Sequence, residues 1–178
     1  HNLAFRGGKE NLKYRLSLGY MNQQGIVKES NLEKYTANLN VTQNLFKDRL
    51  KITSSMIYST VNDTYAPVST NAGFEGSLIG NALVWNPTRE FKLADGSWDQ
   101  FSQSDTKPLA LLDYLDDQAK TIRFLGNLSA ELKIYEELYY KVNLGVDQSN
   151  SKRSFDMSRF LNRIDILDRG FARVYKLS

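Results

Sequence analysis

Apolar and polar side chains alternate along several long segments of the chain. Between residues 13 and 23, the apolar residues Tyr14, Leu16, Leu18 and Tyr20 fall at every second position. A period of two predicts a β-strand with one apolar and one polar face. The same alternation predicts further strands at residues 35–42, 50–61, 121–135 and 138–147, a short strand at 2–8 and a last one at 170–178.

The predicted strands are longer than those of water-soluble domains. The segment 13–23 has 11 residues and the segment 121–135 has 15, whereas strands in soluble domains usually have about five or six. A strand tilted across a bilayer needs about 9–11 residues. The strand lengths therefore favour a membrane-spanning sheet.

The connections between the predicted strands alternate in length. Short connections lie at residues 7–12, 46–49 and 135–137, and long ones at 24–33, 62–120 and 149–169. Outer-membrane barrels have short periplasmic turns and longer extracellular loops in this way. We therefore expect an all-β fold, an antiparallel up-and-down transmembrane β-barrel segment of about seven strands, with residues 62–120 as a long extracellular loop.

The long connection 62–120 differs in composition from the strands. It contains all three prolines and both tryptophans, so no predicted strand is interrupted by a residue that cannot donate to the ladder. Spacing within it predicts short helices at 74–85 and 109–119. A loop of this length with structure of its own is more often functional than a plain linker.

Composition excludes most enzyme chemistry. Among the 178 residues there is no cysteine, and the one histidine is His1. Thiolate nucleophiles, cysteine or histidine metal sites and a Ser-His-Asp triad are therefore not expected. Asp113, Asp116 and Asp117 lack the spacing of a calcium-binding loop. We predict no enzyme activity, no cofactor and no metal.

Hydropathy and charge narrow the class further. The longest apolar runs have four residues, at 82–85 and 109–112, far short of the roughly 20 that a transmembrane helix needs. The mean hydropathy of -0.47 does not exclude a membrane-spanning barrel, because barrel strands carry polar residues at alternate positions. The basic stretch 152–176 is diluted by aspartates and has no recognition motif, so we expect no nucleic-acid partner.

Two sets of residues are candidates for ligand contact. Aromatic side chains in the long loop either stack on sugar rings or pack the loop onto itself: Trp85, Trp98, Tyr65 and Phe74. Polar side chains on the strands share one side, which in a barrel is the lumen: Arg15, Asn38, Asn127, Glu131, Lys133, Lys141 and Asn143. These polar side chains either contact a transported ligand directly or only solvate the lumen. Tyr14 and Tyr20 suit an interfacial aromatic girdle.

Several local motifs carry a family resemblance, and they occur in order along nearly the whole chain. They are His1-Asn2-Leu3, Gly7-Gly8, Ser17-Leu18-Gly19-Tyr20, Asn22-Gln23-Gln24-Gly25-Ile26, Asp95-Gly96-Ser97-Trp98, Lys107-Pro108-Leu109-Ala110-Leu111-Leu112, Arg123-Phe124-Leu125-Gly126-Asn127-Leu128 and Leu144-Gly145-Val146-Asp147. Together they resemble SusC/RagA-type TonB-dependent outer-membrane transporters of Bacteroidetes. Lys107 stands where that family usually has Asn, and Gln24 where it has Glu.

The resemblance implies a partial TonB-dependent receptor barrel over residues 1–178, with the plug domain and remaining strands absent, because large transporters close with about 22 strands. It implies import of oligosaccharides, glycans or peptides across the outer membrane. The implied partners are outer-membrane lipid, a SusD-like surface lipoprotein and the TonB complex acting through absent N-terminal parts. The alternatives are a soluble β-sandwich carbohydrate-binding module, whose apolar faces would be buried against each other, and a different outer-membrane protein such as a porin or adhesin.

Overall fold

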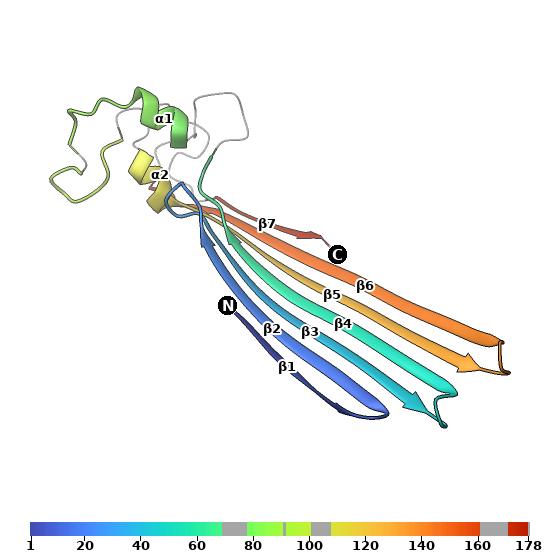
Figure 1. Cartoon of the computed structure of the whole chain (residues 1–178). Coiled ribbons are helices and arrows are strands. Elements are labelled where there is room, and N and C mark those ends of the chain that lie inside the picture. Colours follow the sequence, from blue (N-terminus) through green and yellow to red (C-terminus); the bar gives the residue numbers. More distant parts are fainter. Residues whose placement is uncertain (69–77, 91, 101–107, 161–170, 178) are drawn as a thin grey trace.

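The computed structural model describes residues 1–68, 78–90, 92–100, 108–160 and 171–177. Within this part of the chain, seven strands form one antiparallel sheet in sequence order (Figure 1). The strands are β1 (Asn2–Lys9), β2 (Leu12–Gln24), β3 (Asn31–Leu45), β4 (Leu50–Thr64), β5 (Leu115–Lys133), β6 (Tyr139–Met157) and β7 (Phe171–Leu177). The helices α1 (Leu78–Val84) and α2 (Pro108–Tyr114) lie between β4 and β5. β1 and β7 are the edges of this open sheet, which confirms the predicted fold class.

Short and long connections lie at opposite ends of the sheet (Figure 1). The tight hairpins at residues 10–11, 46–49 and 134–138 form what we call the short-turn end. The connections 25–30, 65–114 and 158–170 leave from the other end, which we call the long-loop end. This arrangement matches the expected alternation of connection lengths.

The register gathers the apolar side chains of successive strands on one face. One continuous row runs across six strands: Phe5, Leu16, Leu39, Met56, Gly126 and Val146. We call this side the apolar face and the opposite side the polar face. The apolar side chains are not covered, since Phe5 is 52% exposed and Val146 is 58% exposed. The sheet therefore presents a continuous apolar surface to its surroundings.

The apolar face has a limited height. On β5 it extends from Ile122 to Leu132, which is about 33 Å along the strand at roughly 3.3 Å per residue. With a strand tilt of about 40°, this length projects to about 25 Å, the usual height of the apolar band of an outer-membrane barrel. We call the surface between these limits the apolar band.

Tyrosines mark the end of the apolar band nearest the long loops. Tyr20 and Tyr35 are directly opposite each other in the register of β2 and β3, and their ring centroids are 5.0 Å apart. Both hydroxyls donate hydrogen bonds to the Glu33 carboxylate, at 3.0 and 2.8 Å. Paired rings whose hydroxyls bond to a carboxylate suit a boundary between an apolar and a polar medium.

The buried core is small and lies at the long-loop end. Ala66, Leu78, Leu111 and Met157 form a cluster, and Val27 of the β2–β3 connection packs against it. This cluster joins two connections, 25–30 and 65–114, to the ends of β5 and β6, so the long loop is anchored to the sheet. In the described part of the chain, no helix is long and apolar enough to span a membrane.

Several element boundaries differ from the sequence predictions. The helix predicted at 109–119 is wrong in its second half, because it ends at Tyr114 and residues 115–119 pair with β6. Strand pairing likewise narrows the long connection from 62–120 to 65–114 and the last one from 149–169 to 158–170. The helix predicted at 74–85 is present as Leu78–Val84, and residues 74–77 lie outside the described residues.

The hairpin between β3 and β4 has an unusual backbone. Phe46, Lys47 and Asp48 all have left-handed φ angles, of 55°, 57° and 64°. This conformation costs L-residues roughly 1–2 kcal/mol each. The side chain of Asn44 donates a hydrogen bond of 2.9 Å to Asp48 Oδ1 and supports the turn.

Candidate functional site

The seven strand residues proposed from the sequence to face a lumen all lie on the polar face. The register places Arg15 of β2 beside Asn40 of β3, and that row continues to Asn127 of β5. Asn38, Glu131, Lys133, Lys141 and Asn143 alternate with apolar residues on the same side of their own strands. The fold thus brings side chains from four strands together as one polar wall.

Cross-strand pairs balance the charge of the polar wall between β5 and β6. Arg123 donates two hydrogen bonds to Asp147, at 3.1 and 2.7 Å. Lys141 lies 3.8 Å from Glu131, and the hydroxyls of Thr121 and Ser151 are 3.0 Å apart. The two side chains of the Arg123–Asp147 pair are 57% and 49% exposed, so the pair contributes little stability. The wall is therefore a hydrated surface of alternating charge and hydrogen-bonding groups.

A second group of polar side chains closes the long-loop end of the polar face. Arg153 of β6 forms a two-bond ion pair with Asp117 of β5, with Nε 2.8 Å from Oδ1. The Arg153 guanidinium also lies 4.8 Å from the centre of the Tyr65 ring, and Tyr175 of β7 is its cross-strand neighbour. We call Tyr65, Asp117, Arg153 and Tyr175 the rim cluster. Its members come from the segment that follows β4 and from the neighbouring strands β5, β6 and β7, and they lie around the Arg153 guanidinium.

Tyr65 is held in its place by both its backbone and its ring. Its backbone N–H donates a hydrogen bond of 2.8 Å to the Asp117 carbonyl. Burial raises the pKa of the Tyr65 hydroxyl, the nearby negative charge of Asp63 raises it further, and Arg153 opposes both. Tyr65 is therefore neutral at physiological pH. Since the residue is 41% exposed, part of Tyr65 is accessible to a ligand.

Ion pairs and rings organise the described part of the long loop. Arg89 donates two hydrogen bonds to Asp99, at 2.7 and 3.0 Å, and Asp99 is only 5% exposed. The Trp98 indole N–H donates a hydrogen bond of 2.7 Å to Asp113 Oδ2. The Lys92 ammonium lies 4.7 Å from the centre of the Trp98 ring. We call these five residues the loop cluster.

The tight turn at Asp95-Gly96-Ser97 supports the loop cluster. Gly96 has a φ of 84°, a conformation that glycine adopts without strain. The Asp95 carboxylate accepts hydrogen bonds from the Ser97 hydroxyl and backbone N–H, at 2.6 and 2.9 Å. These bonds lower the pKa of Asp95. The turn is thereby most stable when Asp95 is ionised.

The aromatic residues proposed to bind sugars are separated in the structure. Tyr65 belongs to the rim cluster and Trp98 to the loop cluster, while Trp85 directly follows α1 with Arg89 6.0 Å from its ring centre. Phe74 lies outside the described residues. The sequence did not predict the rim cluster, because its members come from four distant segments and only the register shows that they meet.

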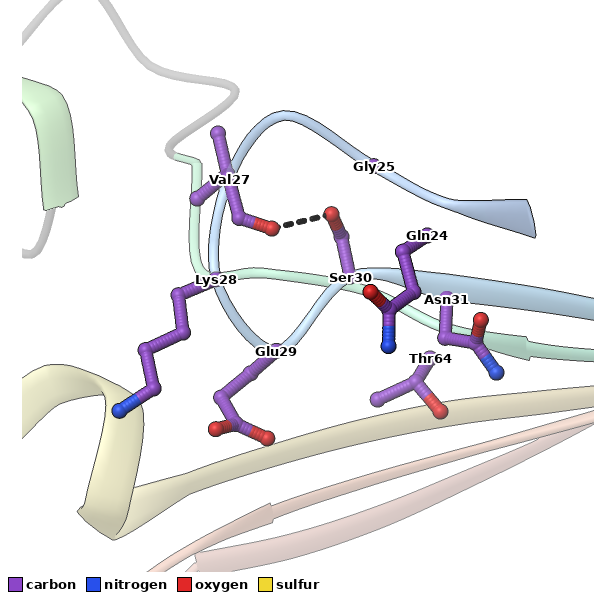
Figure 2. A pocket seen from close by; sticks show the side chains of 8 residues that line it. All are labelled: Gln24, Gly25, Val27, Lys28, Glu29, Ser30, Asn31 and Thr64. Carbon is purple, nitrogen blue, oxygen red and sulfur yellow. Dashed lines mark hydrogen bonds between the residues drawn. The ribbon is translucent and has the colours of Figure 1, made fainter.

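A polar pocket of about 410 Å³ lies where β2 and β3 meet the long-loop end. Figure 2 shows the Ser30 hydroxyl donating to the Val27 carbonyl, with Lys28 and Glu29 projecting from the same turn. The turn approaches Gly25 closely, and a Cβ at this position would lie 2.1 Å from Ser30 Oγ, so that Ser30 would have to shift. The remaining lining residues are Gln24, Asn31 and Thr64. These three share a row beyond Tyr20 on the side of the apolar face, so the pocket is separate from the polar wall.

The three aspartates considered as a cation site each have another role. Asp113 accepts from Trp98, Asp116 accepts from the Gln118 amide at 2.9 Å, and Asp117 is paired with Arg153. Among the described residues, no group of three or more potential metal ligands comes together.

Comparison with known proteins identifies the kind of barrel. TonB-dependent receptor SusC of Bacteroides thetaiotaomicron is 32% identical over 158 residues, which cover 76% of this chain and 15% of that receptor. The chain is of the SusC/RagA type of TonB-dependent receptor. TonB-dependent receptor P26 of Formosa agariphila is 28% identical over 178 residues, which cover 97% of this chain and 17% of the relative. No family model matches the sequence.

Solved structures show the same fold. The peptide importer RagAB in its closed-closed state superposes with a TM-score of 0.71 at 16% identity, over 98% of this chain and 20% of that one. A second structure of the RagAB peptide transporter gives a TM-score of 0.68 at 18% identity, over 88% of this chain and 18% of that one. SusC/RagA-type receptors are outer-membrane proteins, and the bacterial outer membrane is the location of this chain. The chain spans between 14% and 17% of the length of its curated relatives.

Proposed function

We propose that this chain is part of the barrel wall of a TonB-dependent active transporter that imports oligosaccharides, glycans or peptides. The observation that carries this proposal is the division of one continuous sheet into an exposed apolar face and a charged polar face. A bilayer covers the first face, and a water-filled lumen hydrates the second. The name of the RagAB peptide importer supports the peptide class, and the saccharide class rests on the family resemblance.

The residues on this chain have separate roles in the proposed transport. The polar wall offers a hydrated path with hydrogen-bonding groups, so that a polar substrate exchanges water for protein contacts as it passes. Residues 65–114 form the extracellular loop, and Tyr65, Trp85, Trp98 and Phe74 contact the substrate as it enters. An aromatic ring offers an apolar platform to the C–H face of a sugar.

The partners lie outside this chain. A SusD-like surface lipoprotein would cover the long-loop end as a lid, and the inner-membrane TonB complex would supply energy through other parts of the receptor. We place the lid at the long-loop end because the anchored core of Ala66, Leu78, Leu111 and Met157 makes that end a structured surface. These assignments rest on the family resemblance.

Uptake by whole cells tests the proposed function. A strain of the native host that lacks the gene is complemented with the full-length receptor, and uptake of labelled oligosaccharide and peptide pools is measured. The variants Trp98→Ala and Tyr65→Ala are expected to raise the substrate concentration for half-maximal uptake several-fold, since stacking on an aromatic ring contributes about 1 kcal/mol. Uptake unchanged by deletion of the gene, or recovery of the receptor in the soluble fraction, contradicts the proposal.

Tyr135→Ala is the matched control. Tyr135 is 75% exposed and lies in the hairpin at the short-turn end, far along the strands from the proposed entrance. Its removal deletes the same side chain without touching the loop or the rim cluster. An equal effect of Tyr135→Ala and Tyr65→Ala on uptake would show that the losses are general effects on assembly.

The soluble β-sandwich alternative is not favoured. In the described residues, all seven strands lie in one sheet, whereas a sandwich needs a second sheet against the apolar face. Met56 of β4 and Leu128 of β5, on the central strands of that face, are each 43% exposed.

A further inference from the structure

Three lysines stand directly beside one another on neighbouring strands at the long-loop end. Lys120 of β5 is opposite Lys152 of β6, and Lys152 is opposite Lys176 of β7. All three are exposed. Directly opposed residues in a sheet have Cβ atoms about 5 Å apart, and like charges at such positions destabilise the sheet. We call these residues the lysine row.

The lysine row lies on the membrane side of the sheet, beyond the apolar band. Lys120 alternates in phase with Ile122 and Phe124 of the apolar face, and Lys152 with Leu144 and Val146. It is therefore on the outside of the proposed barrel, away from the polar wall. A substrate in the lumen does not reach it.

In the described part of the chain, no carboxylate pairs with the lysine row. Among the residues that the structure describes, none of the three ammonium groups forms an ion pair. On the same face, the nearest acidic residue in the described part of the chain is Glu33, in the same row two strands from Lys120 and therefore about 10 Å away. Asp116 and Asp156 are four residues away along the strands, about 13 Å. Both distances exceed the Debye length of about 8 Å at physiological ionic strength. Among the described residues, the three adjacent positive charges therefore have no neighbouring counter-charge.

The height of the row indicates what neutralises it. Lys120 is two residues beyond Ile122, which is about 5 Å along the membrane normal for a strand tilted by about 40°. Lys152 is directly opposite Lys120 in the register, and Lys176 is directly opposite Lys152. Opposed residues have Cβ atoms about 5 Å apart, so neighbouring lysines differ in height by less than about 5 Å. The headgroup layer of a bilayer adds about 5–7 Å to each side of the hydrocarbon, so the row lies at the level of the lipid headgroups.

We propose that the lysine row binds the phosphate groups of a phosphorylated glycolipid of the outer leaflet. The acyl chains of this lipid lie against the apolar band below the row, beside Phe124 and Val146, and its saccharide headgroup extends upward along β6. Lysine stems can lie along the sheet and bring their ammonium groups to the phosphates. The inference goes beyond import and rests on the membrane orientation given under the proposed function.

Lipid binding to the intact receptor tests the inference. The full-length receptor in phosphatidylcholine nanodiscs is titrated with rough lipopolysaccharide and with the same lipopolysaccharide after enzymatic dephosphorylation. Lys152→Gln is expected to weaken binding of the phosphorylated form about fivefold, and Lys120→Gln/Lys152→Gln/Lys176→Gln at least 25-fold, since each basic residue at an anionic surface contributes roughly a factor of five. The triple Lys→Arg variant is expected to bind like the wild type.

Lys13→Gln/Lys34→Gln/Lys51→Gln is the matched control. It removes the same charge from three exposed lysines on the opposite face of the sheet. Equal losses in the two triple variants, equal binding of dephosphorylated lipopolysaccharide by the wild type, or complete displacement by millimolar inorganic phosphate would each overturn the proposal. So would release of a co-purifying acidic protein by the first triple variant with lipid binding unchanged.

Two further readouts separate glycolipid binding by the lysine row from a purely structural role of the lysines and from the proposed import function. In detergent without glycolipid and at low salt, Lys152→Gln is expected to raise the unfolding temperature by relieving like-charge repulsion, and added lipopolysaccharide should stabilise this variant less than the wild type. The opposite signs would contradict the inference. Loss of uptake in Tyr65→Ala with normal lipopolysaccharide binding concerns only the proposed function.

Discussion

The two faces of the sheet can be distinguished by the loss of folding stability when a single arginine is placed on one side of β5 or on the other. Leu128 is on the apolar face and is 43% exposed, and its neighbour Asn127 is on the polar face. Leu128 is four residues from Leu132 and six from Ile122, which projects to about 10 and 15 Å from the two edges of the apolar band. It is therefore close to the middle of the bilayer.

We expect Leu128→Arg to destabilise the folded receptor by about 2–4 kcal/mol, the cost of an arginine on the lipid face near the midplane. Asn127→Arg places the same side chain in the hydrated lumen and should cost less than about 0.5 kcal/mol, as at an ordinary surface position. Ile122→Arg, at the edge of the band, should fall between them, near 0–1 kcal/mol.

The assay is urea titration of the full-length receptor folded into lipid vesicles, with the folded fraction read from heat-modifiable gel mobility. The order Leu128→Arg, Ile122→Arg, Asn127→Arg from most to least destabilising supports the assignment of the faces. Equal costs at Leu128 and Asn127, or a larger cost at Asn127, would refute it, because a lumen on the Leu128 side reverses the order.

Three other predictions concern the loops and turns. Arg153→Ala removes the cation between Asp117 and Tyr65. We expect the receptor to lose about 1 kcal/mol of folding stability and the pKa of Tyr65 to rise further, as observed by NMR of labelled tyrosine. An unchanged Tyr65 titration would contradict the geometry. Ser97→Ala should raise the pKa of Asp95 toward its usual value, since Ser97 is the main cause of the lowering. The stability that Asp95 gives the turn is complete above its unfolded pKa of about 3.9 and is lost as pH falls through its lower folded pKa. Limited proteolysis of the loop as a function of pH measures this loss. Lys47→Gly should stabilise the β3–β4 hairpin by about 0.5–1 kcal/mol because its φ is left-handed, and a decrease in stability in the urea titration would count against this.

The alternation of side chains predicted the strands wherever one face is apolar. β2 and β3 follow from Tyr14, Leu16 and Leu18 and from Ala37 and Leu39, because lipid selects an apolar residue at every second position. Beyond the apolar band both faces are polar, and the alternation ends although the ladder continues. This is why the start of β5 at Leu115 and the end of β6 at Met157 were missed.

The site was predictable only in part. The seven polar wall residues follow from the same alternation, and the register places them on one face. The rim cluster and the lysine row depend on which residues of distant segments are paired, and no local motif encodes that register. Arg153 meets Tyr65 across 88 positions of sequence because β4 and β6 both flank β5. The alternation of side chains, combined with the strand register, would have predicted both the rim cluster and the lysine row.

Solvent accessibility along β5 in the intact outer membrane tests the central claim most directly. This chain has no cysteine of its own. Single cysteines are placed at positions 126–131 of the full-length receptor, in a background without other cysteines, and carry a spin label. Its collisions are measured against oxygen, which enters lipid, and against a water-soluble nickel complex. The account predicts that positions 126, 128 and 130 favour oxygen and positions 127, 129 and 131 favour the nickel complex. The reverse phase, or no alternation, would contradict it.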